Sequence, residues 1–355
     1  MTQQILDEIR RLGSRIGRPI NLMEVCGTHT VEIFRHGIRD VIPKEIRLMS
    51  GPGCPVCVTP IGDVDAAISI SKMEGTILTT FGDMMRVPGS DCSLNDARAE
   101  GADVRVVYSP LDALRLAKAE QGRKVVFFAT GFETTSPLIA ATLSEALKMG
   151  IGNFYIYSSH KLVPPALRVL LDSPDVLVDG FMLPGHVSAI IGKGPYRFIS
   201  DSYGKPAVIT GFEAVDILEG IFMLLNQLAH GKAEVENQYV KIVRDEGNPR
   251  ALSMIEGYLE PADAHWRGIG MIPLSGLVLR EEYSAHDAKK VFRPHVSNHQ
   301  EPEFCSCGDV LRGVKIPPEC PMFGAGCTPE VPVGACMVST EGSCAAYYRY
   351  GPYHG

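Results

Sequence analysis

Short β-branched and aromatic runs alternate with helical segments from about residue 45 to residue 230. This alternation predicts parallel sheets built from βαβ units. Ser109-Pro110 and Ser136-Pro137 are typical helix starts, because serine accepts hydrogen bonds from free amides and proline fits the first turn. Gly122 and Gly150 are the expected ends of these helices. We expect further helices from about 61 and over 214–229, and strands at 46–49, 76–80, 104–108, 124–130, 154–157, 176–179 and 207–210.

The last fifth of the chain has a different character. Beyond residue 292, proline, glycine and cysteine dominate and hydrophobic periodicity disappears. Proline in a helix interior removes a hydrogen bond and clashes with the preceding turn, so long helices are excluded there. Such an irregular segment needs something other than a large core to hold it. A metal ion or a cluster would serve, because the binding energy of a folded site is folding energy.

Composition excludes several classes of protein. The 355 residues are 45% apolar and 21% charged with a net charge of −7, which fits a chain of two or three folded domains. An acidic balance argues against nucleic acid as the main partner, and no apolar run reaches the roughly 18 residues that span a bilayer. Ile5, Ile9, Leu12 and Ile16 mark a surface helix where a signal peptide would lie. We therefore expect a cytoplasmic protein, in which cysteines serve as ligands, nucleophiles or redox groups.

The ten cysteines form two groups, apart from Cys92. Thiolates are soft ligands and redox groups, so this distribution indicates two separate pieces of sulfur chemistry. The N-terminal group is Cys26, Cys54 and Cys57; the C-terminal group is Cys305, Cys307, Cys320, Cys327, Cys336 and Cys344.

The C-terminal spacing is unusual. Fourteen residues separate Cys305 from Cys320, six separate Cys320 from Cys327, and sixteen separate Cys327 from Cys344. Zinc sites usually contain C-x2-4-C pairs, and common ferredoxins have more compact spacings. Four thiolates from a Pro/Gly-rich loop suit a [4Fe–4S] cluster, with two cysteines left for a redox pair. Zinc and the absence of any bound metal remain alternatives, and spacing does not show which four cysteines bind.

The N-terminal cysteines lie in two short segments. Cys54 and Cys57 form a C-x2-C pair in a glycine-rich turn between a strand and a helix, typical of a thioredoxin-like dithiol or half a metal site. Cys26 and His29 are close enough for the imidazole to influence the thiol. That pattern fits an activated nucleophile, a ligand or no special role. Together, Cys26, Cys54 and Cys57 supply three soft ligands, and His29 is a possible proton carrier. This set is enough for an iron site that is open to substrate.

Two further segments follow predicted strands. Thr130-Gly-Phe-Glu-Thr-Thr135 precedes a helix, where free amides favour either an anion or a simple cap by Thr135 or Ser136. Its first four residues recur at 210–213 as a weak internal repeat. Leu183-Pro-Gly-His-Val-Ser188 makes His186 a candidate site residue, because loops at the carboxyl ends of parallel strands line binding sites.

In these residues the chain resembles the HypD family of [NiFe]-hydrogenase maturation factors. The resemblance covers nearly the whole chain. It is carried by the C-x14-C-x6-C-x16-C pattern and by four segments in order: Met23-Glu-Val-Cys-Gly-Thr-His-Thr30, Ser50-Gly-Pro-Gly-Cys-Pro-Val-Cys-Val-Thr-Pro60, 130–135 and 183–188.

The resemblance implies an α/β fold. It predicts two small parallel-sheet, Rossmann-like domains facing a cleft, plus a third mixed domain with an irregular cysteine-rich iron–sulfur segment. We place the first domain at 45–125 with Cys54 and Cys57, and the second at 126–213. The third domain comprises 1–44 and 214–355, with the cluster segment at about 292–355.

The resemblance also implies a function. Family members assemble an iron centre with two cyanides and one carbon monoxide, Fe(CN)2CO, together with the small chaperone HypC, and accept cyanide from a thiocyanate carried by HypE. By analogy, Cys26, Cys54 and Cys57 hold the iron, with His29 and His186 managing protons. The cluster would bind Cys305, Cys320, Cys327 and Cys344, leaving Cys307 and Cys336 as a redox pair. We expect a monomer that joins these partners, with no nucleic acid and no membrane.

Two other functions remain open at this point. One is a thiol–disulfide oxidoreductase, similar to ferredoxin:thioredoxin reductase, that acts through Cys54 and Cys57. The other is a zinc-stabilised binding protein without redox chemistry. Iron and sulfide analysis separates the zinc protein from the other two.

Overall fold

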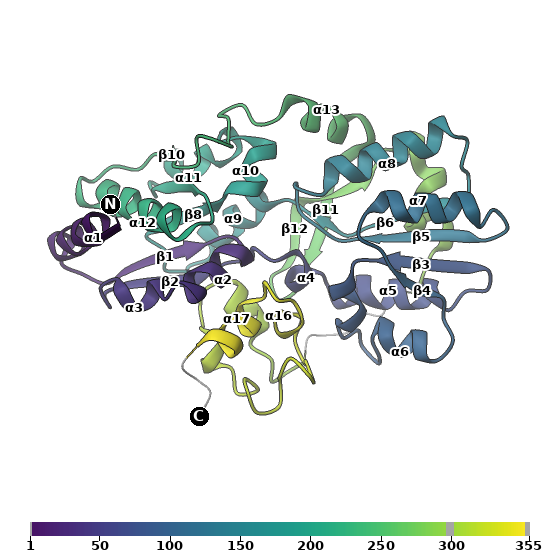
Figure 1. Ribbon diagram of the computed structural model, residues 1–355, viewed down its shortest axis with the longest axis horizontal. Coiled ribbons are helices and arrows are strands. Elements are labelled where there is room, and N and C mark those ends of the chain that lie inside the picture. The colour runs from purple at the N-terminus through teal and green to yellow at the C-terminus, as the bar shows by residue number, and fades with distance from the viewer. Residues whose placement is uncertain (1, 296–301, 352–355) are drawn as a thin grey trace.

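The computed structural model describes residues 2–295 and 302–351, and contains two parallel sheets and one antiparallel sheet (Figure 1). The predicted α/β fold class with a cysteine-rich C-terminal segment is confirmed. Residues 296–301 and 352–355 of that predicted segment lie outside the described residues. No helix in the described part of the chain is long and apolar enough to cross a bilayer.

The first parallel sheet, sheet A, has the strand order β10-β9-β8-β1-β2. Helix α12 contacts β9, and α1 packs on α12, so the apolar face of the N-terminal helix is buried as its periodicity predicts. The strands are β1 (Ile20–Glu24), β2 (Ile46–Ser50), β8 (Gly180–Pro184), β9 (Ala207–Thr210) and β10 (Val235–Asn237). Around them are α1 (Thr2–Ile16), α2 (Gly27–Arg35), α3 (Ile38–Val41), α9 (Val163–Asp172), α10 (Gly185–Ile191), the 3-10 helix η2 (Gly194–Tyr196), α11 (Arg197–Asp201) and α12 (Ala214–Ala229).

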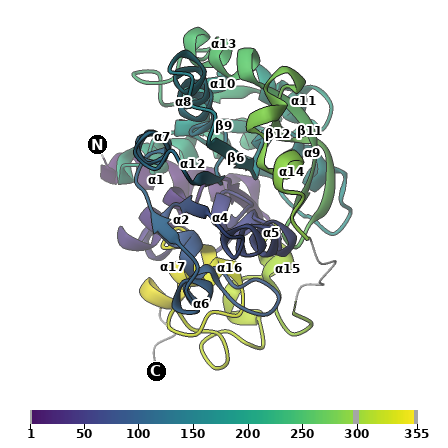
Figure 2. The same cartoon turned by 90° about the vertical axis from the view of Figure 1, so that its right-hand side faces the viewer.

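The second parallel sheet, sheet B, has the order β4-β3-β5-β6. Helix α5 contacts β3 and α7 contacts β5, while α14 contacts β6 (Figure 2). The strands are β3 (Thr76–Thr80), β4 (Val104–Val106), β5 (Lys124–Ala129) and β6 (Phe154–Ser158). The accompanying helices are α4 (Pro55–Val58), α5 (Ile61–Ser71), η1 (Gly82–Arg86), α6 (Leu94–Ala99), α7 (Pro110–Ala119), α8 (Ser136–Lys148), α13 (Pro249–Tyr258), η3 (Glu281–His286) and α14 (Ala288–Phe292).

Local sequence explains most element boundaries. Ser109 caps α7 by accepting from the Leu111 amide at 3.2 Å, as the Ser-Pro signal predicts. Helix α8 also begins at its predicted Ser-Pro signal and ends just before Gly150, which has a φ of +65°. The expected cap of α8 by Thr135 or Ser136 is not formed, because the Ser136 hydroxyl donates to the Phe132 carbonyl and the Thr135 hydroxyl bonds His160.

One strand prediction was wrong. Residues 176–179 form no strand; the strand is β8, Gly180–Pro184, and all five of its residues are buried. The β-branched Val176 and Val178 suggested the earlier run. A central strand of a parallel sheet is buried on both faces, however, and 181–183 supply the continuous apolar run that this requires.

The sheets also cut across the predicted domain ranges. Strand β5 spans the 125/126 boundary and pairs with β3, while β1 from the first 44 residues pairs with β8 from the range 126–213. Strand pairing depends on long-range contacts that local patterns do not encode. The division of the chain into domains stays a prediction.

A long hairpin lies between the two parallel sheets (Figure 1). Strands β11 (Leu259–Trp266) and β12 (Gly270–Leu279) pair with each other, and β12 also pairs with β7 (His160–Lys161). The Trp266 indole donates to Ser275 at 2.8 Å, and its ring stacks on Phe132. The hairpin therefore ties the loop after β5 to the centre of the molecule.

The C-terminal segment contains only short helices, as its prolines predict. These are α15 (Cys307–Leu311), η4 (Pro317–Glu319), α16 (Ala335–Val338) and α17 (Ser343–Tyr350). Helix α16 packs on α4, and α17 packs on α2 (Figure 1). The cysteine-rich segment thus lies against both helices that follow the N-terminal cysteines.

Candidate cysteine-based functional site

The two N-terminal cysteine segments meet at the carboxyl edge of sheet A. Cys26 follows β1, and Cys54 follows the adjacent strand β2. The Gly27 amide donates to the Gly53 carbonyl at 3.1 Å. An ideal Cβ on Gly53 would lie 2.3 Å from the Cys26 backbone nitrogen, so only glycine allows this approach.

Gly53→Ala is therefore expected to destabilise the protein by about 1–3 kcal/mol, the usual range for overpacking a tight contact. Urea unfolding followed by circular dichroism would measure the change. Gly122→Ala is the matched control, since a Cβ added at Gly122 would meet no atom within 4 Å. Equal midpoints for both variants would contradict the proposed close approach.

Cys54 and Cys57 form a disulfide across the first turn of α4. Both side chains are buried, and the Cys57 amide donates to Cys54 Sγ at 3.3 Å. Sulfur in a disulfide is not a thiolate ligand. In this oxidised state Cys26 is the one free thiol of the N-terminal three, so an iron site using all three requires prior reduction.

Cys26 is a partly exposed residue at the N-terminus of helix α2. Burial of the sulfur raises the pKa of this thiol to about 11, and the nearby Glu341 carboxylate contributes to the rise. The amides of Thr28 and His29 act in the opposite direction but do not compensate. The free thiol is consequently protonated at neutral pH, and metal binding must displace that proton.

Iron-free protein should react slowly with iodoacetamide at Cys26. A pKa of about 11 in place of 9.0 lowers the thiolate population at pH 8, partly offset by the higher nucleophilicity of the more basic thiolate. We expect a rate about tenfold below that of the unfolded chain, rising in Glu341→Gln. Site-resolved mass spectrometry would follow the rate of alkylation at Cys26. A rate equal to the unfolded chain and insensitive to Glu341→Gln would contradict this environment.

The two predicted histidines are brought together around Phe212. His29 stacks on this ring at a centroid distance of 4.7 Å, and His186 stacks on it at 4.0 Å. The three residues follow β1, β8 and β9, which lie side by side in sheet A. They therefore share its carboxyl edge with Cys26, as expected for a parallel sheet.

Both histidines are neutral at pH 7. His29 is fully buried, and its Nε2 donates to the Gly211 carbonyl at 2.9 Å, which assigns the proton to Nε2. Burial lowers the pKa of His29 to about 4. Partial desolvation also lowers the pKa of the solvent-exposed His186, while Glu341 opposes that shift.

Glu341 completes this group, and no pattern in the sequence pointed to it. Its carboxylate accepts a hydrogen bond from the Thr28 hydroxyl at 2.8 Å. A Cβ on Gly27 would lie 2.4 Å from the Glu341 carbonyl oxygen, so the α16–α17 loop sits directly on the start of α2. The contact joins residues 313 positions apart, beyond the reach of local pattern reasoning.

The six C-terminal cysteines line one pocket. Its remaining walls are largely apolar and include Val310, Phe323 and Met337. The Ser306 amide donates to Cys320 Sγ at 3.4 Å, and the Val333 amide donates to Cys327 Sγ at 3.3 Å. Amide donors to sulfur stabilise thiolates, as iron–sulfur sites require.

The donor atoms that line this pocket are thiols, which are soft metal ligands. Within residues 2–295 and 302–351, no group of three or more His, Cys, Asp or Glu side chains is arranged to hold one metal ion. A zinc ion needs four ligand atoms at about 2.0–2.3 Å from one point. A four-iron cluster gives each thiolate its own iron, so its ligands stand farther apart.

Cys307 and Cys336 stand close together within this pocket, with 3.0 Å between their Sγ atoms. Both are buried and share an apolar core with Cys54 and Cys57. Helix α16, which carries Cys336, packs on α4, which carries Cys57. The two cysteine pairs are therefore neighbours, although 278 residues separate Cys57 from Cys336 in the sequence.

Comparison with known proteins agrees with these features. A family model described as "HypD: Hydrogenase formation hypA family" matches residues 1–351. The chain is 48% identical over 360 residues to "Hydrogenase maturation factor HypD" of Rhodobacter capsulatus, covering 99% of this chain and 96% of that protein. The chain belongs to the HypD family. It is also 44% identical to "Hydrogenase maturation factor HypD" of Escherichia coli K12, covering 98% and 94% of the two chains.

Cys92 lies apart from both cysteine groups in this HypD chain. It is partly buried against the core of sheet B. Burial raises the pKa of its thiol, so its side chain behaves as a small apolar group.

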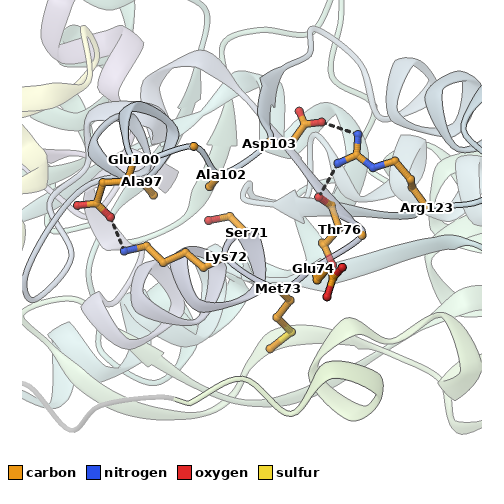
Figure 3. A pocket seen from close by; sticks show the side chains of 12 residues that line it. Ser71, Lys72, Met73, Glu74, Thr76, Ala97, Glu100, Ala102, Asp103 and Arg123 are labelled. Atoms are coloured by element: carbon orange, nitrogen blue, oxygen red, sulfur yellow. Dashed lines mark hydrogen bonds and ion pairs between the residues drawn. The ribbon is translucent and has the colours of Figure 1, made fainter.

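A polar pocket lies elsewhere on this HypD fold, at the amino ends of strands β3, β4 and β5 (Figure 3). Arg123 donates to Asp103 at 2.7 Å and to the Thr76 carbonyl at 3.1 Å, while Lys72 pairs with Glu100 at 2.7 Å. Both of its basic side chains are paired with carboxylates, and ligand sites in parallel sheets lie at the carboxyl edge, so we assign it no function.

Proposed function

We propose that this chain is a scaffold for hydrogenase maturation in the cytoplasm. Together with a HypC partner it binds iron at Cys26, Cys54 and Cys57, and the Fe(CN)2CO moiety is assembled there with cyanide from HypE. The observation that carries the proposal is the meeting of Cys26, His29, His186 and the Cys54–Cys57 pair at one edge of sheet A. Membership of a hydrogenase-formation family supports it.

Cyanide release from a thiocyanate sets the chemical requirements. In R–S–C≡N + 2e⁻ + H⁺ → R–SH + CN⁻, the carbon–sulfur bond breaks, and two electrons and one proton are consumed. A dithiol that closes to a disulfide supplies two electrons and two protons. Cys307 and Cys336, whose Sγ atoms lie 3.0 Å apart, can therefore act as the reductant, which leaves Cys54 and Cys57 as thiolate ligands of the iron.

We assign the [4Fe–4S] cluster to Cys305, Cys320, Cys327 and Cys344. When bound, it supplies single electrons of low potential. The protein contributes the amides that donate to Cys320 and Cys327, an apolar wall, and glycine at position 334. A Cβ on Gly334 would lie 2.9 Å from Cys305 Sγ, so a larger residue would push into the sulfur pocket.

The polar residues around Cys26 orient the site. His29 is neutral, and its Nε2 donates to the Gly211 carbonyl. This hydrogen bond fixes the orientation of the imidazole ring on the helix that follows Cys26. Solvent-exposed His186 is the group through which protons can reach solvent. Glu341 accepts a hydrogen bond from Thr28 and so connects the cysteine-rich segment to the start of α2. A movement of that segment would therefore alter the surroundings of Cys26.

Infrared spectra of the protein purified anaerobically with its HypC partner test the proposal. Cyanide and carbonyl stretches should appear from an iron-loaded complex. Their absence from an intact complex with iron bound would reject it.

A thiol–disulfide oxidoreductase is the second candidate, favoured by the formed Cys54–Cys57 disulfide beside Cys336. Such an enzyme would reduce a partner protein's disulfide with an electron donor and without iron at Cys26. Turnover by Cys26→Ala equal to that of wild type would favour this function.

A further inference from the structure

A buried acidic side chain lies next to the candidate iron site and has no role in the proposed function. Glu24 is the last residue of β1, two positions before Cys26, and is 1% exposed. Its Oε1 accepts from the Ser50 hydroxyl at 3.0 Å and from the Thr30 hydroxyl at 3.5 Å. Arg39 donates to the same oxygen at 3.1 Å. Donors from β2, α2 and α3 therefore converge on one carboxylate oxygen.

These hydrogen bonds tie together the two segments that carry the N-terminal cysteines. Ser50 ends β2 directly before the turn that leads to Cys54, and it pairs with Glu24 in the register of sheet A. Thr30 lies on α2, and its hydroxyl also donates to the Cys26 carbonyl at 3.4 Å. One carboxylate thus fixes the start of the Cys54 turn relative to the helix that follows Cys26.

Arg39 connects this carboxylate to the cysteine-rich segment. Its guanidinium lies 4.8 Å from the centre of the Phe34 ring and 5.3 Å from the centre of the Tyr347 ring, and it also donates to the Leu48 carbonyl. Phe34 is on α2, whereas Tyr347 is on α17, the helix that carries Cys344. A guanidinium suits this position because it stacks on aromatic rings while its N–H groups bond oxygen atoms.

Stability alone does not explain this buried ion pair. Removing two charges from water costs free energy that their mutual attraction repays only in part, so apolar residues of similar volume often serve a fold equally well. A buried ion pair can instead select one arrangement of the chain. Here the segments that it arranges are the two proposed to bind iron, and metal ligands depend on support from residues that do not touch the metal.

We propose that Glu24 and Arg39 are positioning residues of the iron site. Their ion pair holds the segments of Cys26 and Cys54 at the separation that one metal ion requires, and it acts on the metal only through these cysteines. This inference rests on the proposed function. Because Arg39 also packs on Tyr347, the same pair sets the position of α17 relative to the two cysteine segments.

The affinity for Cd²⁺ of the reduced protein, combined with its HypC partner, tests this role. Cd²⁺ is a soft ion that prefers thiolates, and the ¹¹³Cd chemical shift increases with the number of bound sulfur atoms. The signal that disappears in Cys26→Ala, but not in Cys92→Ala, defines binding at the N-terminal cysteines. Arg39→Gln, which loses the charge but keeps an N–H donor, should weaken that binding about 10- to 100-fold, the usual cost of losing an outer partner of a metal ligand.

A double variant separates positioning from stability. Glu24→Met with Arg39→Met removes both charges at similar volume, so we expect its thermal unfolding temperature to stay near that of wild type. Its Cd²⁺ affinity should nevertheless be low and its ¹¹³Cd shift changed, because no carboxylate joins the two cysteine segments. Glu32→Met with Arg35→Met is the matched control, since it removes an ion pair of 2.9 Å on α2 whose arginine is exposed. This control should bind Cd²⁺ as wild type does.

The outcomes distinguish the two proposals. Wild-type protein without any Cd²⁺ binding that depends on Cys26 rejects the iron site, and with it the proposed function. Wild-type affinity and an unchanged ¹¹³Cd shift in the folded double variant reject only the positioning role. If the double variant does not fold, Arg39→Gln decides by the same criterion, and an affinity equal to that of wild type overturns the role.

Discussion

Cys305→Ala is expected to lose nearly all cluster iron and inorganic sulfide and to unfold the C-terminal segment locally. The segment has a very small apolar core of its own, in which Cys327, Met337 and Ala345 are the buried members. Without a cluster, the sulfur pocket would hold free thiols in an apolar setting. The binding energy that orders the loops would be lost with the metal.

Metal and sulfide analysis, thermal unfolding and limited proteolysis of residues 302–351 would measure this effect. Cys92→Ala is the matched control, because Cys92 packs against the core of sheet B and is outside the sulfur pocket. Iron content and thermal stability unchanged from wild type in Cys305→Ala would contradict the ligand assignment.

Cys26→Ala is expected to abolish maturation while keeping the cluster. The side chain lies at the carboxyl edge of sheet A and is absent from the six-cysteine pocket, so iron and sulfide at that pocket should remain at wild-type levels. Truncating one thiol at a helix start leaves the packing of Gly53 on the backbone of residue 26 intact, so global stability should change little.

Hydrogenase activity in cells that carry the variant as their sole HypD gene provides the readout. We expect activity at background level. A Cys26→Ala variant that still supports hydrogenase activity would refute the role given to this thiol. Comparison with Cys92→Ala separates the loss of a specific ligand from the general loss of a cysteine.

Elements with local signals were predictable from the sequence. The Ser-Pro starts of α7 and α8 and the apolar stripe of α1 specified helix boundaries and buried faces within a few residues. The strand that ends at Pro184 was misplaced because burial on both faces, rather than β-branching, selects a central strand. Sheet membership across the 125/126 boundary was likewise beyond local patterns.

The candidate site divides in the same way. Motif spacing and the family resemblance singled out nine cysteines and two histidines. Thiols and imidazoles can be recognised in a sequence because their ligand and proton-transfer chemistry belongs to the side chain itself. The gathering of His29 and His186 against Phe212 follows instead from the strand order β9-β8-β1 at one parallel-sheet edge. Which of these residues bind iron or the cluster stays a prediction.

The residue pattern alone identifies an α/β chain with two groups of cysteines and an irregular C-terminal segment. The folded chain adds that the Cys54–Cys57 pair lies beside Cys336, that Glu341 reaches Thr28, and that Glu133 is buried with one carboxylate oxygen unpaired among the described residues. The physical reason is that ligand chemistry belongs to individual residue types. Proximity, burial and unpaired polar atoms arise from contacts between distant segments, which the folded chain alone creates.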